Sequence, residues 1–250
     1  MTATTFPTTR DGLPATLPGL RGHARVLRAL RRDGIRLAAR RRPLDSDSGD
    51  FVIATPAGPG RWLVAVGDVM GRGRAAEALA HEIRVFLRAR AARASSLAEL
   101  LRGANHVALS FAEGERFASL LLLLVDGTRR TLRIANAGHC EPLAGGRSGG
   151  VVALEGHGPA LGILPGAEFR EAGPLRLPTG VTLVATTDGV LEAQDARGRM
   201  FGREGAARAF AAARASGPRA VVRHVLDEVE AHAAGPLTDP ATVVALQFDR

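Results

Sequence analysis

The sequence predicts an α+β domain in which antiparallel sheets are covered by helices. Its 250 residues are 46% hydrophobic, which is enough to build a sizeable core. Short apolar runs are mostly separated by hairpin turn signals, and helical periods gather in two blocks. Parallel sheets would need strands and helices to alternate throughout, so this order favours antiparallel sheets. No internal repeat or long linker divides the chain, and we expect a single domain over residues 20–250.

The N-terminal segment combines an aperiodic leader with one amphipathic stretch. Residues 1–19 are rich in Thr and Pro and lack periodicity, so we expect a flexible leader. Residues 20–32 predict a helix that either docks on the domain or pairs with a partner helix, which would make a homodimer. The apolar side of this helix consists of Leu20, Ala24, Leu27 and Leu30.

The remaining elements follow from apolar period and turn residues. Pro56–Gly60 and Asp126-Gly127 indicate hairpins, and Pro178–Gly180 predicts a hairpin between strands at 168–175 and 181–186. The predicted strands are 35–42, 51–55, 62–66, 117–125, 131–135, 141–144, 151–154, 168–175, 181–186 and 242–248. The predicted helices are 74–93, 97–110, 190–193, 203–213 and 218–233.

Charge and composition narrow the class of partner. Basic residues exceed acidic ones by 33 − 25 = 8, and all of the basic residues are Arg. Such an excess is typical of proteins with acidic partners, membrane surfaces or nucleic acid, but these arginines are dispersed, and one Trp with no Tyr offers few stacking platforms. A single cysteine, Cys140, excludes an internal disulfide, and no window has the length of a membrane span. We therefore expect a cytoplasmic protein that binds neither nucleic acid nor membrane.

Four aspartates lie beside predicted strand ends, where a rigid element can aim a carboxylate that the adjoining loop leaves accessible. They are Asp50, Asp68, Asp188 and Asp239. Mg²⁺ and Mn²⁺ prefer such oxygen ligands, whereas the absence of clustered Cys and His argues against zinc. Two cations about 4 Å apart can share a carboxylate and acidify a bridging water, which is the chemistry of phosphate-ester hydrolysis. The alternative is that each aspartate only caps backbone N–H groups of a turn.

Three further features have competing interpretations. Gly71-x-Gly73-x-x-Ala76 fits a dinucleotide fingerprint, but the chain lacks the second strand ending in an acid about 20 residues later. His139 is a candidate general acid or a turn-stabilising residue. Cys140 has no Cys/His/Asn arrangement around it in the sequence and is interpreted as a packed thiol.

Five segments, in this order, resemble the SpoIIE/RsbU-like branch of the metal-dependent (PPM-type) serine/threonine protein phosphatases. The resemblance spans roughly residues 35–248, and its strength comes from the order of motifs that are individually weak. The segments are G-D-V-M-G-R-G-R-A-A (67–76), N-A-G-H-C-E-P-L (136–143), G-P-A-L-G-I (158–163), T-T-D-G-V-L-E-A (186–193) and D-P-A-T-V-V-A-L (239–246).

The resemblance implies a four-layer αββα sandwich of a bacterial signalling hydrolase, with its catalytic core over residues 35–248. It implies two Mn²⁺ or Mg²⁺ ions between the sheets and a metal-bound hydroxide that hydrolyses phosphoserine or phosphothreonine. The implied substrate is a phosphorylated anti-sigma-factor antagonist of a partner-switching pathway. By motif, Asp68 would bridge both metals and the Val69 carbonyl would bind one. Asp50, Asp188 and Asp239 would complete the shells directly or through water.

Three positions depart from the family pattern. Ile53 replaces a second acid after the G-D-F segment, Pro240 replaces the second acid of a D-D pair, and Arg72 replaces a Lys. The four matched aspartates remain, which favours an active enzyme. The alternative function is a catalytically impaired relative that binds a phosphoprotein as a regulator.

Overall fold

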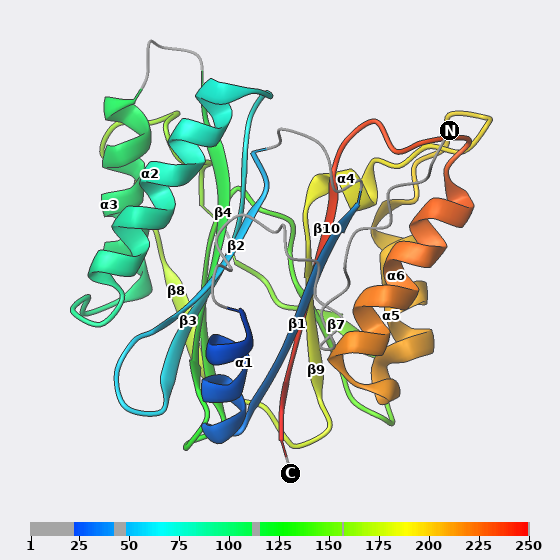
Figure 1. Cartoon of the computed structure of the whole chain (residues 1–250), viewed down its shortest axis with the longest axis horizontal. Helices are drawn as coiled ribbons and strands as arrows, with labels where there is room; N and C mark the ends of the chain where they lie inside the picture. The colour runs from blue at the N-terminus through cyan, green and yellow to red at the C-terminus, as the bar shows by residue number, and fades with distance from the viewer. Residues whose placement is uncertain (1–22, 43–48, 112–115, 157, 250) are drawn as a thin grey trace.

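The computed structural model describes residues 23–42, 49–111, 116–156 and 158–249, which form two five-stranded antiparallel sheets. One sheet has the order β1-β10-β9-β6-β7 and the other β2-β3-β4-β5-β8. Figure 1 shows the two sheets side by side, with α2 and α3 outside one sheet and α5 and α6 outside the other. The predicted α+β class and the antiparallel sandwich flanked by helix pairs are confirmed.

The elements correspond closely to those predicted. The strands are β1 (Ile35–Arg42), β2 (Phe51–Pro56), β3 (Arg61–Val69), β4 (Ala118–Asp126), β5 (Thr131–Ala137), β6 (Leu143–Gly145), β7 (Val151–Ala153), β8 (Glu171–Arg176), β9 (Thr182–Thr186) and β10 (Ala241–Phe248). The helices are α1 (His23–Arg32), α2 (Arg74–Arg90), α3 (Leu97–Ser110), α4 (Asp188–Leu191), α5 (Gly202–Ala213), the 3₁₀ turn η1 (Arg214–Ser216) and α6 (Pro218–His232).

Three apolar layers hold the sandwich together, and the strand period assigns each side chain to one of them. In β3, Leu63 and Ala65 face α2 and α3, whereas Val64 and Val66 face the second sheet. A third cluster fills the space between β10 and the helices α5 and α6. Because β3 and β10 are covered on both faces, their sequences are apolar at nearly every position, which explains the continuous runs.

One predicted hairpin is wrong. The strands around Pro178–Gly180 do not pair with each other, because β8 pairs with β5 and β9 lies between β10 and β6 in the other sheet. Every residue of β9 is buried, so it needs two neighbouring strands, whereas β8 is largely exposed and forms a sheet edge. The connection therefore crosses from one sheet to the other.

The helix α1 docks on the domain, which was one of its two predicted arrangements. Leu27 and Leu30 are buried in the apolar layer between the sheets. The predicted leader at 1–19, Leu20 of the predicted helix and residues 43–48 of the connection after β1 lie outside the described residues. None of the helices in the described ranges combines the length and the apolar character that crossing a bilayer requires.

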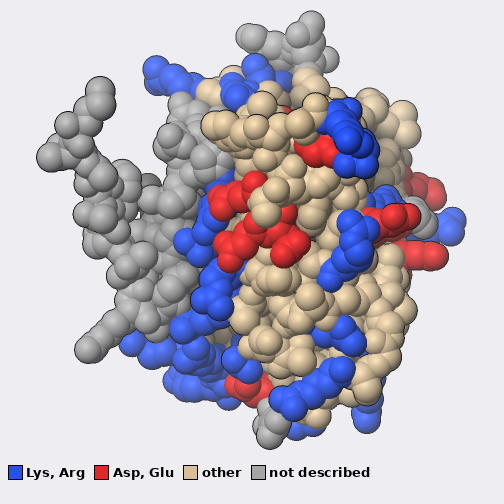
Figure 2. All heavy atoms as spheres, turned by 90° about the vertical axis from the view of Figure 1, so that its right-hand side faces the viewer, with Lys and Arg blue, Asp and Glu red and all other residues tan. Residues whose placement is uncertain are grey.

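The face formed by α5 and α6 carries both signs of charge. Figure 2 shows acidic side chains gathered near the middle of this face, with basic side chains beside them. Arg42 of β1 pairs with Asp227 and Glu230 of α6, and Arg203 pairs with Glu141. Arg42 and Arg203 are thus partly neutralised by ion pairs with acidic side chains on this side of the molecule.

Candidate metal centre

The four predicted aspartates come together at one end of the sandwich. Asp50 immediately precedes β2, Asp68 lies near the end of β3, Asp188 begins α4, and Asp239 lies just before β10. The negative charges of Asp50, Asp188 and Asp239 all raise the pKa of Asp68, which requires the four carboxylates to be near neighbours. The hairpin β2–β3 and the connections into α4 and β10 therefore meet at this end.

Asp68 differs from its predicted setting because β3 is longer than the apolar run 62–66 indicated. The strand continues through Val69, since Asp68 and Val69 pair with Ser119 and Ala118 of β4. Asp68 is therefore held inside a sheet and not in the loop that follows it. This placement fixes the direction of its carboxylate more firmly than a loop would.

Asp50 and Asp68 form a hydrogen-bonded pair of carboxyl groups. Burial is the largest cause that raises the pKa of Asp50 to about 6, and burial followed by the charge of Asp50 raises the pKa of Asp68 to about 9. Two adjacent carboxylates cannot both ionise at low cost, so Asp68 retains a proton and shares it with Asp50 near neutral pH.

Two buried threonines bind Asp50 from the opposite sheet. The Oγ1 atoms of Thr187 and Thr242 both donate hydrogen bonds to Oδ2 of Asp50, with the Thr187 bond at 3.1 Å. The backbone N–H of Thr242 donates to Oγ1 of Thr187 over 3.0 Å. Thr187 follows β9 and Thr242 lies in β10, so these bonds join the two sheets at the acidic end.

Two glycines allow the segments of the cluster to approach one another. A Cβ atom at Gly49 would lie 2.2 Å from the carbonyl oxygen of Val69, and one at Gly189 would lie 2.3 Å from that of Pro240. Both distances are far inside van der Waals contact, so only glycine fits at either position. Gly49 thus packs the Asp50 segment against the end of β3, and Gly189 packs α4 against the start of β10.

The outer two aspartates are exposed and differ in their partners. Oδ1 of Asp188 accepts the backbone N–H of Gly189 over 2.9 Å. Asp239 forms an ion pair with Arg72, whose guanidinium also donates to the carbonyl oxygen of Thr238. The side chains of Arg72 and Asp239 are 59% and 57% exposed. This pair links the turn after β3 to the segment before β10.

A second arginine lies close to the inner acids. Arg41 of β1 is buried and is the register partner of Thr242. Burial lowers the pKa of Arg41, and the negative charges of Asp50 and Glu77 oppose that effect. The positive charge of Arg41 in turn lowers the pKa of Asp50, although less than burial raises it.

His139 supports the cluster indirectly. Its Nδ1 atom lies 2.7 Å from Oγ of Ser119, the residue that pairs with Asp68 in β4. Its backbone N–H donates to Oδ1 of Asn136 over 2.7 Å, and its backbone C=O accepts a hydrogen bond from Nδ2 of Asn136 over 2.8 Å. These two bonds stabilise the turn. Burial lowers the pKa of His139 to about 4, so the ring is neutral near pH 7, and its single N–H is a much weaker acid than an imidazolium. These contacts favour the turn-stabilising role.

Cys140 lies next to this turn and is a weakly acidic thiol. Burial, followed by the negative charge of Asp188, raises its pKa to about 12. A thiol in that state is a poor nucleophile. The structure thus agrees with its interpretation as a packed side chain.

The donor chemistry of the cluster fits hard divalent cations. All four side chains are carboxylates, and the inner pair shares a proton that a cation could replace. Within the described residues, no three Asp, Glu, His or Cys side chains lie close enough together to hold a metal ion as they stand. Asp239 is paired with Arg72, and Asp50 is hydrogen-bonded to the threonines, so binding a cation requires these side chains to move.

Several residues of the centre were not predicted from the sequence. Thr187 and Thr242 lie inside quoted motifs, but their contact with Asp50 spans 137 and 192 residues of chain. The ion pair of Arg72 with Asp239 spans 167 residues of chain. Arg41 and its register partner Thr242 lie in β1 and β10, the first and last strands. Ile53, where the family pattern has an acid, is fully buried in the layer between β2 and the helices α2 and α3.

The two antiparallel sheets flanked by helices define the fold of the PP2C-type phosphatases. The SiaA PP2C domain of Pseudomonas aeruginosa has this fold, with a TM-score of 0.70 and 22% identity over 94% of this chain and 92% of that one. The RsbU and RsbW domains of Rv1364c from Mycobacterium tuberculosis match with a TM-score of 0.70 and 24% identity, over 86% of this chain and 60% of that one.

The family model described as Stage II sporulation protein E (SpoIIE) matches residues 58–249. The chain therefore belongs to the SpoIIE family. The PPM serine/threonine phosphatase MsPP from Mycobacterium smegmatis shares its fold, with a TM-score of 0.64 and 19% identity over 86% of this chain and 97% of that one. The predicted resemblance is confirmed. Protein IcfG of Synechocystis sp. is 26% identical over 190 residues, which cover 65% of this chain and 30% of IcfG. The chain thus spans about a third of the length of this curated relative.

Proposed function

We propose that this chain removes phosphate from phosphoserine or phosphothreonine in a protein, using two Mn²⁺ or Mg²⁺ ions held by its aspartate cluster. The observation that carries the proposal is the meeting of four aspartates at one end of the sandwich, each beside a strand end or a helix start, where the charges of the other three raise the pKa of Asp68. A cluster of four carboxylates around one proton is costly for folding alone, and it suits the binding of divalent cations.

Each aspartate would have a separate task in this proposal. Asp68, rigid within β3, would be shared by both cations, with the Val69 carbonyl as a neighbouring ligand. Asp50 would be aimed by its two threonines, and the exposed Asp188 and Asp239 would complete the site on the solvent side. When bound, the cations would neutralise phosphate charge and acidify a water near neutral pH.

The substrate class is proposed from the family. The RsbU domain of Rv1364c occurs together with an RsbW domain in one structure, which supports a setting in bacterial partner switching. We infer a phosphorylated anti-sigma-factor antagonist as the substrate, met in the cytoplasm. A homodimer built on α1 would have to use surface other than Leu27 and Leu30, because both are buried within the chain.

The decisive experiment measures phosphate release from a phosphoseryl peptide by purified protein with MnCl₂. We expect Asp68→Asn to lower the rate by about 10³-fold or more, because several kcal/mol of transition-state stabilisation would be lost. Asp227→Asn is the matched control, since Asp227 is an exposed aspartate on α6 outside the cluster. Equal rates for wild type and Asp68→Asn would refute the proposal.

The second candidate is a phosphoprotein-binding regulator without turnover. It is favoured by Ile53, which places a buried apolar side chain where the family has an acid. Calorimetric titration separates the two candidates when combined with the rate assay. Binding of Mn²⁺ together with phosphate release supports the enzyme, whereas phosphopeptide binding with no release supports the regulator.

A further inference from the structure

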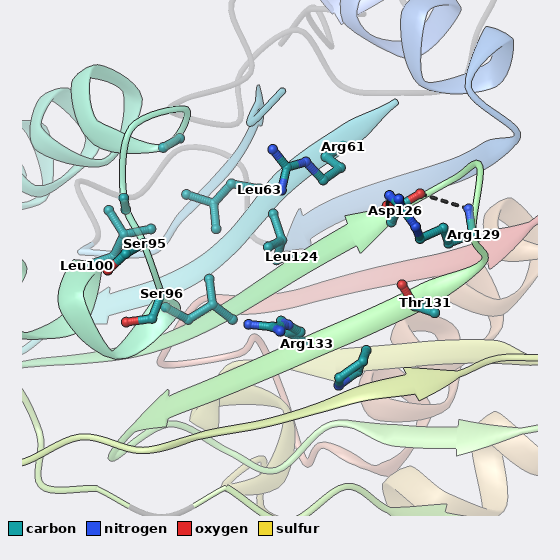
Figure 3. A pocket seen from close by; sticks show the side chains of 14 residues that line it. Arg61, Leu63, Ser95, Ser96, Leu100, Leu124, Asp126, Arg129, Thr131 and Arg133 are labelled. Carbon is teal, nitrogen blue, oxygen red and sulfur yellow. Dashed lines mark hydrogen bonds and ion pairs between the residues drawn. The ribbon is translucent and has the colours of Figure 1, made fainter. Parts of the chain in front are cut away.

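A hollow of about 380 Å³ lies at the other end of β3 from the aspartates. It opens between the connection of α2 to α3 and the outer face of β3, β4 and β5, as Figure 3 shows. Arg61 at the start of β3 lines it, and Asp68 lies seven residues further along the strand. At ~3.3 Å per residue, the two sites are roughly 23 Å apart.

The inner part of this hollow is apolar. Leu63 and Leu124 project from the sheet into it, and Leu100 closes it from α3. Leu63 and Leu100 belong to the apolar layer between the sheet and the helices, so the hollow is the open end of that layer. A ligand that enters it would meet hydrocarbon side chains first on its buried side.

The rim is cationic, because three arginines line it. Arg129 is paired with Asp126, and Arg133 is paired with Glu171 over 2.7 Å. Arg61 makes no ion pair or side-chain hydrogen bond with any other described residue. Asp126 and Glu171 neutralise Arg129 and Arg133, so the remaining positive charge of the rim is that of Arg61.

The backbone makes room for Arg61. A Cβ atom at Gly58, which has a φ of 123°, would lie 2.6 Å from a terminal guanidinium nitrogen of Arg61. A side chain at that position would push the guanidinium away. The turn between β2 and β3 thus leaves room for the guanidinium of Arg61 beside Gly58.

Glu171 demonstrates how this wall binds a carboxylate. One of its oxygens accepts the backbone N–H of Leu97 at the start of α3 over 2.6 Å, and the other accepts a hydrogen bond from Arg133. Arg133 also lines the hollow, and its guanidinium carries five N–H donors, of which the bond to Glu171 uses one. Donors for a second acidic group are therefore present beside an existing carboxylate contact.

We propose that this hollow binds a small organic anion, a carboxylate or a phosphate monoester attached to an apolar body. The anionic group would lie between Arg61 and Arg133, and the apolar body would contact Leu63, Leu100 and Leu124. The volume lies within the range of small-molecule pockets, and an apolar interior with a few fixed polar groups is their usual composition. Planar guanidinium groups suit carboxylate and phosphate alike.

The test titrates ¹⁵N-labelled protein with three probes that share a naphthalene body, in the absence of divalent cations. The probes are 2-naphthoate, naphthalene-2-phosphonate and the uncharged 2-naphthamide. We expect saturable shifts of the amides at residues 61, 95–97 and 131–133 with at least one anion, and at least fivefold weaker binding of the amide. The two anions distinguish a carboxylate ligand from a phosphate ligand.

Variants at one exposed position make the result specific. Arg61→Gln should weaken the anion at least fivefold and Arg61→Glu should abolish its binding, while the spectra report that both remain folded. Arg93→Gln is the matched control, because Arg93 is an exposed arginine beside the hollow that does not line it. Equal affinity for anion and amide, shifts confined to other residues, or equal effects of Arg61→Gln and Arg93→Gln would overturn the proposal.

Discussion

The ion pair between Arg72 and Asp239 should compete with a cation for the Asp239 carboxylate. Both side chains are more than half exposed, and exposed ion pairs contribute about 0.5–1 kcal/mol. Removing that competition corresponds to about a two- to fivefold change in affinity. We therefore expect Arg72→Gln to bind Mn²⁺ about two- to fivefold more tightly than the wild type, with Arg72→Lys between them.

Isothermal titration calorimetry with MnCl₂ at low ionic strength measures this change, since salt weakens exposed ion pairs. Arg74→Gln is the control, because Arg74 is also exposed and begins α2 two residues later. In an Asp239→Asn background the effect of Arg72→Gln should vanish, as a double-mutant cycle requires for a direct interaction. Weaker Mn²⁺ binding by Arg72→Gln would refute competition and would assign Arg72 a supporting role at Asp239.

Three more predictions concern the buried acids and their surroundings. The folded protein keeps the Asp68 proton up to about pH 9, whereas the unfolded chain loses it near pH 3.8. The free energy of unfolding, measured by thermal melts in the presence of a chelator, should therefore fall as the pH rises from 6 to 9. Asp68→Asn should flatten that slope. For the same reason, Mn²⁺ binding at pH 7 should release close to one proton, seen as a calorimetric enthalpy that varies with buffer ionisation enthalpy; no such variation would contradict the shared proton. Ile53→Asp should lower the free energy of unfolding by about 4 kcal/mol or more because it buries an unpaired charge, whereas Ile53→Val should cost about 1 kcal/mol in urea denaturation. Greater Mn²⁺ affinity in a stable Ile53→Asp protein would show that this position faces the cations after all.

The sequence predicted the strands well because most are apolar on both faces, a pattern that survives in any packing arrangement. It failed at the connection 177–181, because turn residues alone do not state whether the chain returns to its own sheet or crosses to the other. In the structure, residues 182–186 are buried on both faces and paired along both edges, and these two facts depend on the packing of the whole sheet.

The aspartates were predictable for a similar reason, since strand ends and motif order both mark them. Their supports were not, because the contacts of Thr187, Thr242, Arg41 and Arg72 depend on how segments more than 50 residues apart come into register. A threonine such as Thr187, which precedes Asp188, can form many local hydrogen bonds. Its bond to Asp50 exists only because the two sheets meet at that residue.

The two inner aspartates have more contacts within the fold than the two outer ones, and this difference sets the order in which a cation would meet them. Asp50 is fixed by two threonines from the opposite sheet, and Asp68 is fixed within a strand. Asp188 begins a four-residue helix, and Asp239 is held by one exposed ion pair. The inner pair is held by the sheets and shares a proton, whereas the outer pair is exposed to solvent. A cation approaching from solvent therefore meets the exposed carboxylates of Asp188 and Asp239 first. The inner pair becomes available only when its shared proton leaves.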